Sequence, residues 1–327
     1  PQASAQTDPH DLPPRIRAVI ALPGASADHS ADVFPAQPAM PRSVPTSRSA
    51  RFRNALAASP ALWWALLYFF CLLCGYYVLR PGARTGFGEL IEPQQADLQK
   101  YAVFSKSKLT DESAAWVRFG LTDGDAVLGD LGLHLGPASD SVASAGPLLA
   151  VRLSDGRAEL WAPAAEAERL QGRLAALLPQ APLNDWLLAQ VRAGVGQVFG
   201  ATRELFIPQM INLQAVGGVS FKKGCYTGQE IVARMQYLGK LKRRLQRLRL
   251  VGSELPAVGI ELFSPVHGSS VGEVVLAAQA GEAVELLAVL QEDAVSDGRI
   301  HLGSSEGPTL TLLDLPYQLD ADQEIQR

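Results

Sequence analysis

The residues best suited to chemistry lie together in one short segment, Phe221 to Arg234. This segment places the Cys225 thiol beside the cations Lys222 and Lys223, with a glycine on either side of the thiol. Cationic neighbours lower the pKa of a thiol and favour its nucleophilic thiolate form, and glycine lets the backbone approach a ligand closely. The pattern predicts a reactive cysteine in a loop. A surface loop with solvated lysines and an inert cysteine is the alternative.

A helix is expected directly after this loop. The apolar residues Ile231, Val232, Met235 and Leu238 follow Gln229 at helical spacing. The free backbone N–H groups at the start of such a helix attract anions. An anionic ligand is therefore expected to approach the same place as the thiol.

Several blocks of the sequence together resemble the YgfZ family, which comprises folate-binding relatives of the aminomethyltransferase of the glycine cleavage system. The longest block runs from Asn212 through the cysteine segment to Arg234. Further similar blocks are Glu92–Gln94, Lys100–Lys106, Phe206–Met210 and Leu315–Tyr317. The resemblance extends from about residue 92 to the end of the chain.

This resemblance implies a protein that binds tetrahydrofolate or a derivative and supports the maturation or repair of iron–sulfur enzymes. The implied partners are folate and client enzymes such as one that thiolates tRNA, which links the protein indirectly to tRNA modification. By the match, Cys225 is the functional thiol. The implied cofactor-binding residues are Trp186, Lys223, Tyr226, Gln229, Glu230 and Arg234.

Two points of the resemblance leave alternatives open. The face of Trp186 can stack on a pterin ring, but the same residue also fits as a core aromatic on a helix from Leu183 to Arg192. A true folate-dependent aminomethyltransferase is a rival function. Against it, this chain has Arg192-Ala193-Gly194 where the glycine cleavage enzyme has a Glu-x-Gly element that contacts folate.

The first ninety residues do not match the family. Residues 1–60 are rich in Ala, Pro, Ser and Arg and are expected to be disordered. Residues 61–80 begin with nineteen uncharged residues, long enough to cross a membrane. We interpret residues 1–88 as foreign to the rest, through a fusion, frameshift or assembly error. A membrane-anchored folate-binding module and a buried core helix are the alternatives.

The family's N-terminal folate wall, with its Leu-Gln-Gly-Gln-type motif, is not found in this chain, which predicts weak folate binding. Three cysteines, two of them inside the apolar run, favour a reducing compartment. The expected location is therefore the cytoplasm, or the membrane if residues 61–80 are native. No cysteine and histidine spacing predicts a metal site.

Charge is distributed unevenly along the chain. The formal net charge is −4, which argues against a protein that generally coats nucleic acid. Residues 222–249 nevertheless contain nine Lys or Arg and one acid, Glu230. This basic run fits a solvated face of a strand, a site that attracts the polyglutamyl tail of folate, or a contact with RNA. Of these three, we do not expect direct RNA binding.

The local patterns predict an α+β fold. Residues 148–161 alternate around Ser154-Asp155-Gly156, which indicates a hairpin, and helical spacing follows over 164–178 and 183–195. Short β-rich runs from residue 245 predict a small C-terminal barrel. The expected domains are an aminomethyltransferase-like folate-binding domain at 89–244, its N-terminal part missing or replaced, and a β-barrel at 245–327.

Overall fold

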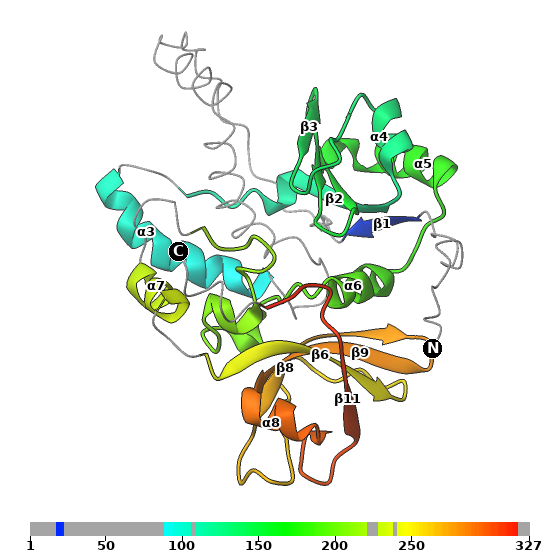
Figure 1. The fold of residues 1–327 in the computed structure, drawn as a ribbon. Coiled ribbons are helices and arrows are strands. Elements are labelled where there is room, and N and C mark those ends of the chain that lie inside the picture. Colours follow the sequence, from blue (N-terminus) through cyan, green and yellow to red (C-terminus); the bar gives the residue numbers. More distant parts are fainter. Residues whose placement is uncertain (1–17, 23–87, 106–108, 221–227, 238–240, 320–327) are drawn as a thin grey trace, which may run out of the picture.

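The computed structural model describes residues 18–22, 88–105, 109–220, 228–237 and 241–319. Within these ranges the chain forms an antiparallel sheet with two covering helices and, after it, a closed β-barrel (Figure 1). Helix α6 lies between the sheet and the barrel. The predicted α+β class and the predicted C-terminal barrel are both confirmed.

The sheet has the strand order β1-β2-β5-β4-β3, and every neighbouring pair is antiparallel. Its core face carries Phe119, Leu121 and Leu160, which pack against Leu170 and Leu174 of α5. The elements of this part are β1 (Ala18–Leu22), β2 (Trp116–Thr122), α4 (Asp125–Asp130), β3 (Val142–Ala145), β4 (Leu148–Arg152), β5 (Ala158–Pro163) and α5 (Ala167–Leu177). The predicted hairpin is confirmed as β4–β5.

Strand β1 comes from the segment for which we expected no regular structure. It pairs antiparallel with β2, with Ala18 opposite Thr122. The rest of residues 1–60, and the apolar residues 61–80, lie outside the described residues. No helix in the described part of the chain is long and apolar enough to cross a membrane.

The barrel closes in the strand order β10-β11-β6-β9-β8-β7. Its interior is aliphatic, with Leu248, Leu262, Val274 and Leu286 all inaccessible to solvent. Its elements are β6 (Arg243–Val251), β7 (Glu261–Phe263), β8 (Gly272–Ala280), β9 (Ala283–Gln291), α8 (Glu292–Asp297), β10 (Ile300–Leu302) and β11 (Thr309–Leu313). Burial of this aliphatic surface is the main stabilising contribution in the barrel.

Helix α6 (Leu183–Arg192) connects the two parts. Asp185 lies in its first turn and Arg192 in its last, which suits the helix dipole. Val191 packs with Leu245 and Leu287 on the outer surface of the barrel. The remaining elements are α3 (Gly88–Ser105), α7 (Gln229–Tyr237) and the short 3-10 turns η1 (Ser113–Ala115), η2 (Ala164–Glu166), η3 (Gly200–Thr202) and η4 (Pro208–Ile211).

Candidate functional site

The cysteine segment is described only at its second half. Lys223, Cys225 and Tyr226 lie outside the described residues. Helix α7 begins at Gln229, as predicted. On it Gln229 is half-buried, whereas Glu230 and Arg234 are exposed.

A buried glutamine fixes the position of α7. Gln209 of η4 is almost fully buried, and its side-chain Nε2 donates a hydrogen bond of 2.7 Å to the carbonyl oxygen of Val232 in α7. Val232 is itself buried, and its N–H donates to the carbonyl of Gly228 at 3.2 Å. The helix that follows the cysteine loop is thus anchored by a residue that precedes the loop.

A second anchor joins η4 to the barrel and to the C-terminal segment. Asn212, which is fully buried, donates from Nδ2 to the carbonyl of Leu245 at 3.1 Å and to the Tyr317 hydroxyl at 3.4 Å. The Tyr317 hydroxyl donates in turn to the carbonyl of Gly194 at 2.8 Å. Burial raises the pKa of Tyr317, which keeps this hydroxyl protonated.

Gly194 is required at this junction for two reasons. Its φ is +67°, in the left-handed region that glycine tolerates best. A Cβ there would also lie 2.7 Å from Cε1 of Tyr317. The end of α6, η4 and the C-terminal segment are therefore held together through Tyr317.

Trp186 is buried on the side of α6 that faces the sheet, with 3% of its surface exposed. A Cβ on Gly120 of β2 would lie 2.5 Å from Cε3 and Cζ3 of its ring, so only glycine fits there. The Arg157 guanidinium lies over the ring, with its Cζ 4.0 Å from the ring centroid. Trp186 is both a buried aromatic and part of a polar cluster.

Arg157 is held in place by two acceptors. Its Nε donates to Asp155 at 2.5 Å and its Nη1 donates to the carbonyl of Trp186 at 3.3 Å. Burial lowers the pKa of Arg157, and the Asp155 charge opposes that effect.

A related cluster lies on the same face of the sheet. Arg118 and Gly120 share one face of β2, and Glu159 and Trp161 share the matching face of β5. Arg118 pairs with Glu159 at 3.3 Å and lies 5.0 Å from the centroid of the Trp161 ring. Trp161 donates from Nε1 to Glu159 at 3.1 Å.

Sequence reasoning missed these polar residues on the sheet. A signal for them was present, because Val117, Phe119 and Leu121 alternate with Arg118 and Gly120 and so put an arginine on the non-core face. No local signal links Arg157 to Trp186, which are 29 positions apart.

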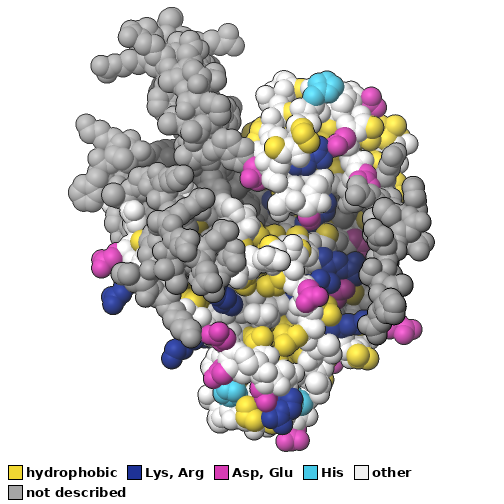
Figure 2. All heavy atoms as spheres, in the orientation of Figure 1, with side chains coloured by type: hydrophobic (Ala, Val, Ile, Leu, Met, Phe, Trp, Pro, Cys, Tyr) yellow, Lys and Arg dark blue, Asp and Glu magenta, His cyan; other side chains and the backbone are white. Residues whose placement is uncertain are grey.

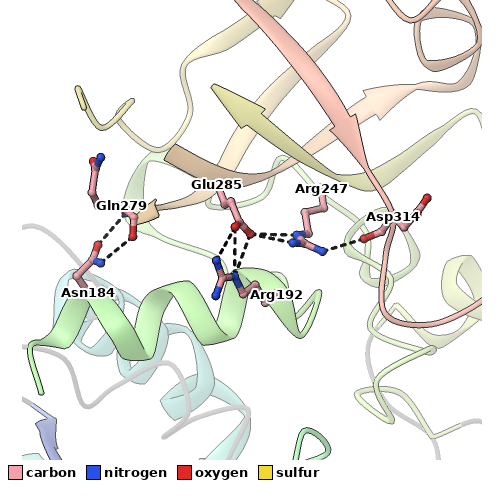
Figure 3. Close-up of polar contacts among 6 residues, drawn as sticks. All are labelled: Asn184, Arg192, Arg247, Gln279, Glu285 and Asp314. Carbon is pink, nitrogen blue, oxygen red and sulfur yellow. Dashed lines mark hydrogen bonds and ion pairs between the residues drawn. The ribbon is translucent and has the colours of Figure 1, made fainter. Parts of the chain in front are cut away.

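The opposite side of α6 contacts the barrel through polar groups as well (Figure 3). Near the start of the helix, Asn184 exchanges two hydrogen bonds with the backbone of Gln279, at 2.9 and 2.8 Å. At its end, Arg192 reaches Glu285 of β9 at 2.7 Å, and Arg247 of β6 reaches the same carboxylate at 2.9 Å. Arg247 also donates to the carbonyl of Asp314 at 3.1 Å.

Glu285 is ionised within this cluster. Burial raises the pKa of Glu285, but the hydrogen bonds and charges of Arg192 and Arg247 outweigh it and hold the pKa below its ordinary value. The hydrogen bonds that Arg192 donates to Glu285 raise the pKa of Arg192.

The basic run is therefore partly neutralised by acids that are distant in sequence. Arg243 pairs with Glu273, and Arg247 pairs with Glu285, while Arg249 is exposed. Basic and acidic side chains lie side by side between the level of the sheet and that of the barrel (Figure 2). Within the described residues, no group of three or more His, Cys, Asp or Glu side chains could hold a metal ion.

Comparisons with known proteins identify relatives along most of the chain, although no family model matches it. The chain is 37% identical over 237 residues to the tRNA-modifying protein YgfZ of Sodalis glossinidius, covering 70% of this chain and 71% of that protein. It is 35% identical over 242 residues to the YgfZ protein of Yersinia pseudotuberculosis (72% of this chain and 73% of that protein) and 35% identical over 252 residues to that of Edwardsiella ictaluri (73% and 76%).

Among the solved structures with a similar arrangement is that of the glycine cleavage system aminomethyltransferase T from Bartonella henselae. The TM-score is 0.49 at 16% sequence identity, and the match covers 69% of this chain and 65% of that one, less than two thirds of its length.

Proposed function

This chain belongs to the YgfZ family, and we propose that it binds a reduced folate and supports the maturation or repair of iron–sulfur enzymes, with Cys225 as its functional thiol. An enzyme that thiolates tRNA is the kind of client we propose, because the curated relatives are named tRNA-modifying proteins. The proposed location is the cytoplasm, where a free thiol stays reduced.

The observation that carries the proposal is the anchoring of both flanks of the cysteine segment. On the N-terminal side, η4 is joined to the barrel through Asn212 and Leu245. On the C-terminal side, α7 is joined to η4 through Gln209 and Val232. A functional site needs supports whose own side chains are locked by packing and hydrogen bonds, and these supports meet that requirement.

The chemistry that we propose for the segment follows from its residue types. Lys222 and Lys223 favour the thiolate of Cys225, which is the reactive form of the side chain. Lys223 and the exposed Arg234 are proposed to pair with carboxylates of the folate tail. Gln229, Glu230 and Tyr226 complete the proposed cofactor-binding set, and Trp186 is the proposed aromatic contact of the pterin.

Replacement of the thiol tests this proposal. A strain that lacks its own homologue is complemented with the wild type, with Cys225→Ala, or with Cys71→Ala as a matched control outside the segment. Thiolated nucleosides in tRNA and the activity of the iron–sulfur client are measured at equal protein level. We expect the Cys71 variant to restore both and the Cys225 variant to restore neither. Full rescue by Cys225→Ala would exclude a functional thiol.

A further inference from the structure

The ring of Trp186 is enclosed by groups of this chain. The position that a Cβ of Gly120 would occupy is 2.5 Å from Cε3 and Cζ3 and 3.0 Å from Cδ2. If this Cβ position lay in the plane of the ring, beside the Cε3–Cζ3 edge, its distance to Cδ2 would exceed the 3.0 Å that is found. Gly120 therefore lies over one face of the ring. The three atoms nearest to this Cβ position all belong to the Trp186 ring, and none belongs to Arg157. This agrees with an Arg157 guanidinium over the opposite face of the ring.

Arg157 covers the ring in the manner of a flat ligand. Its guanidinium is planar, and its Cζ lies over the ring, 4.0 Å from the ring centroid. Its Nε donates a hydrogen bond to Oδ2 of Asp155 at 2.5 Å, while Oδ1 of Asp155 accepts the backbone N–H of Arg157 at 3.2 Å. Only 6% of the Arg157 surface is exposed, so the rest of the chain covers this residue almost completely.

The Trp186 ring face and the Asp155 carboxylate also suit the pyrimidine half of a pterin. The 2-amino-4-oxopyrimidine ring of a reduced folate is flat and presents its 2-amino group and N3–H side by side, an N–C–N arrangement of donors like that of guanidinium. A carboxylate can accept both of these hydrogen bonds, and an indole face can stack on the ring.

We propose that the Trp186 face and the Asp155 carboxylate form a subsite for an aminopyrimidinone ring, that Arg157 occupies this subsite in the free chain, and that the ligand displaces Arg157. The subsite rests on the proposed folate binding and specifies which groups take the pterin end. Asp155 exchanges the Nε–H of Arg157 for the donors of the ring, and the Trp186 ring exchanges one planar partner for another, while the carbonyl of Trp186 loses its hydrogen bond from Nη1 of Arg157.

The local structure permits this exchange. Asp155 and Arg157 flank Gly156 in the turn between β4 and β5, where Ser154, Asp155 and Gly156 are exposed and Gly156 has φ +84°. Burial lowers the pKa of Arg157, so the charged guanidinium regains hydration when it leaves. An exposed turn at the end of a hairpin can move without disturbing the core beneath β2 and β5.

Calorimetric titration with 5-formyltetrahydrofolate tests the subsite in the full chain. We expect Arg157→Ala to bind about 3- to 30-fold more tightly than the wild type, the range that loss of a competing cation–π contact implies. Arg157→Lys, which keeps the charge without the flat surface, serves as the milder variant and is expected to bind more tightly as well. In either background, Asp155→Asn is expected to weaken binding, since Arg157 no longer masks its effect.

Two controls separate the subsite from other causes. Arg152→Ala alters the same turn, because Arg152 donates to the carbonyl of Gly156 at 3.1 Å, but it is expected not to tighten binding. The fragment p-aminobenzoylglutamate lacks the pterin, and its affinity is expected to be the same in all variants.

Equal or weaker binding by both Arg157 variants, or equal tightening by Arg152→Ala, would overturn the subsite while leaving folate binding intact. No binding of 5-formyltetrahydrofolate by the wild type or any variant would overturn the proposed folate binding and the subsite with it.

Discussion

The carboxylate of Glu285 is expected to fasten α6 to the barrel, and Glu285→Gln tests this. The substitution keeps the size of the side chain and removes the charge that Arg192 and Arg247 share. Arg192 has 53% of its side chain exposed, so its pair is screened and contributes little, about 0.5 kcal/mol. Arg247 is more buried, and its charged hydrogen bonds contribute about 1.5 kcal/mol. The expected loss in free energy of unfolding is therefore about 2 kcal/mol.

The pH dependence of this loss has a definite sign. The pKa of Glu285 is held below its ordinary value of 4.5, so its contribution is present above that pH and is lost as the pH falls through the lower folded-state pKa. Because Gln does not titrate, the difference between wild type and variant is expected to be full near about pH 7 and to shrink below about pH 4.

Urea unfolding followed by far-UV circular dichroism and tryptophan emission measures both effects. Glu282→Gln is the matched control, because Glu282 is exposed in the turn of the same β8–β9 hairpin. The reasoning is refuted if the two variants have the same stability at neutral pH, or if the Glu285 difference persists in acid.

Three further perturbations follow from single contacts. Gly120→Ala is expected to destabilise the chain by about 1–3 kcal/mol, since its Cβ would meet the Trp186 ring at 2.5 Å, whereas Gly172→Ala meets no atom within 4 Å; equal melting temperatures for the two variants would contradict this. Tyr317→Phe is expected to lose about 1 kcal/mol in thermal unfolding at neutral pH. Because the pKa of Tyr317 is raised, its contribution is present below its ordinary value of 10.0 and is lost as the pH rises through the folded-state pKa, so the wild type and the Phe variant should converge in alkali. Gln209→Leu is expected to speed amide hydrogen exchange in α7 without changing it in the barrel strands, and unchanged exchange in α7 would show that other contacts hold the helix.

The local elements of this protein were largely determined by the sequence alone. The exposed turn Ser154–Gly156 between alternating residues predicted the β4–β5 hairpin, and that pairing is confirmed. The helical spacing after Gln229 predicted α7, and the spacing after Leu183 predicted α6. Helix α6 ends at Arg192, within the helical spacing predicted over 183–195, and Gly194 then turns the chain with a positive φ. Periodicity and turn residues act over a few positions, so a sequence displays them directly.

The pairing of charged and aromatic side chains was decided only by the tertiary structure. Trp186 was identified, but its contacts with Gly120 and Arg157 depend on how α6 packs on the sheet. Arg192 was noted as a departure from the Glu-x-Gly element and Arg247 as part of the basic run, yet both pair with Glu285 on another strand. Ion pairs and stacking act over a few ångströms in space, whatever the separation along the chain. The sequence therefore indicates which groups are available, and the packing of α6 between sheet and barrel determines which of them meet.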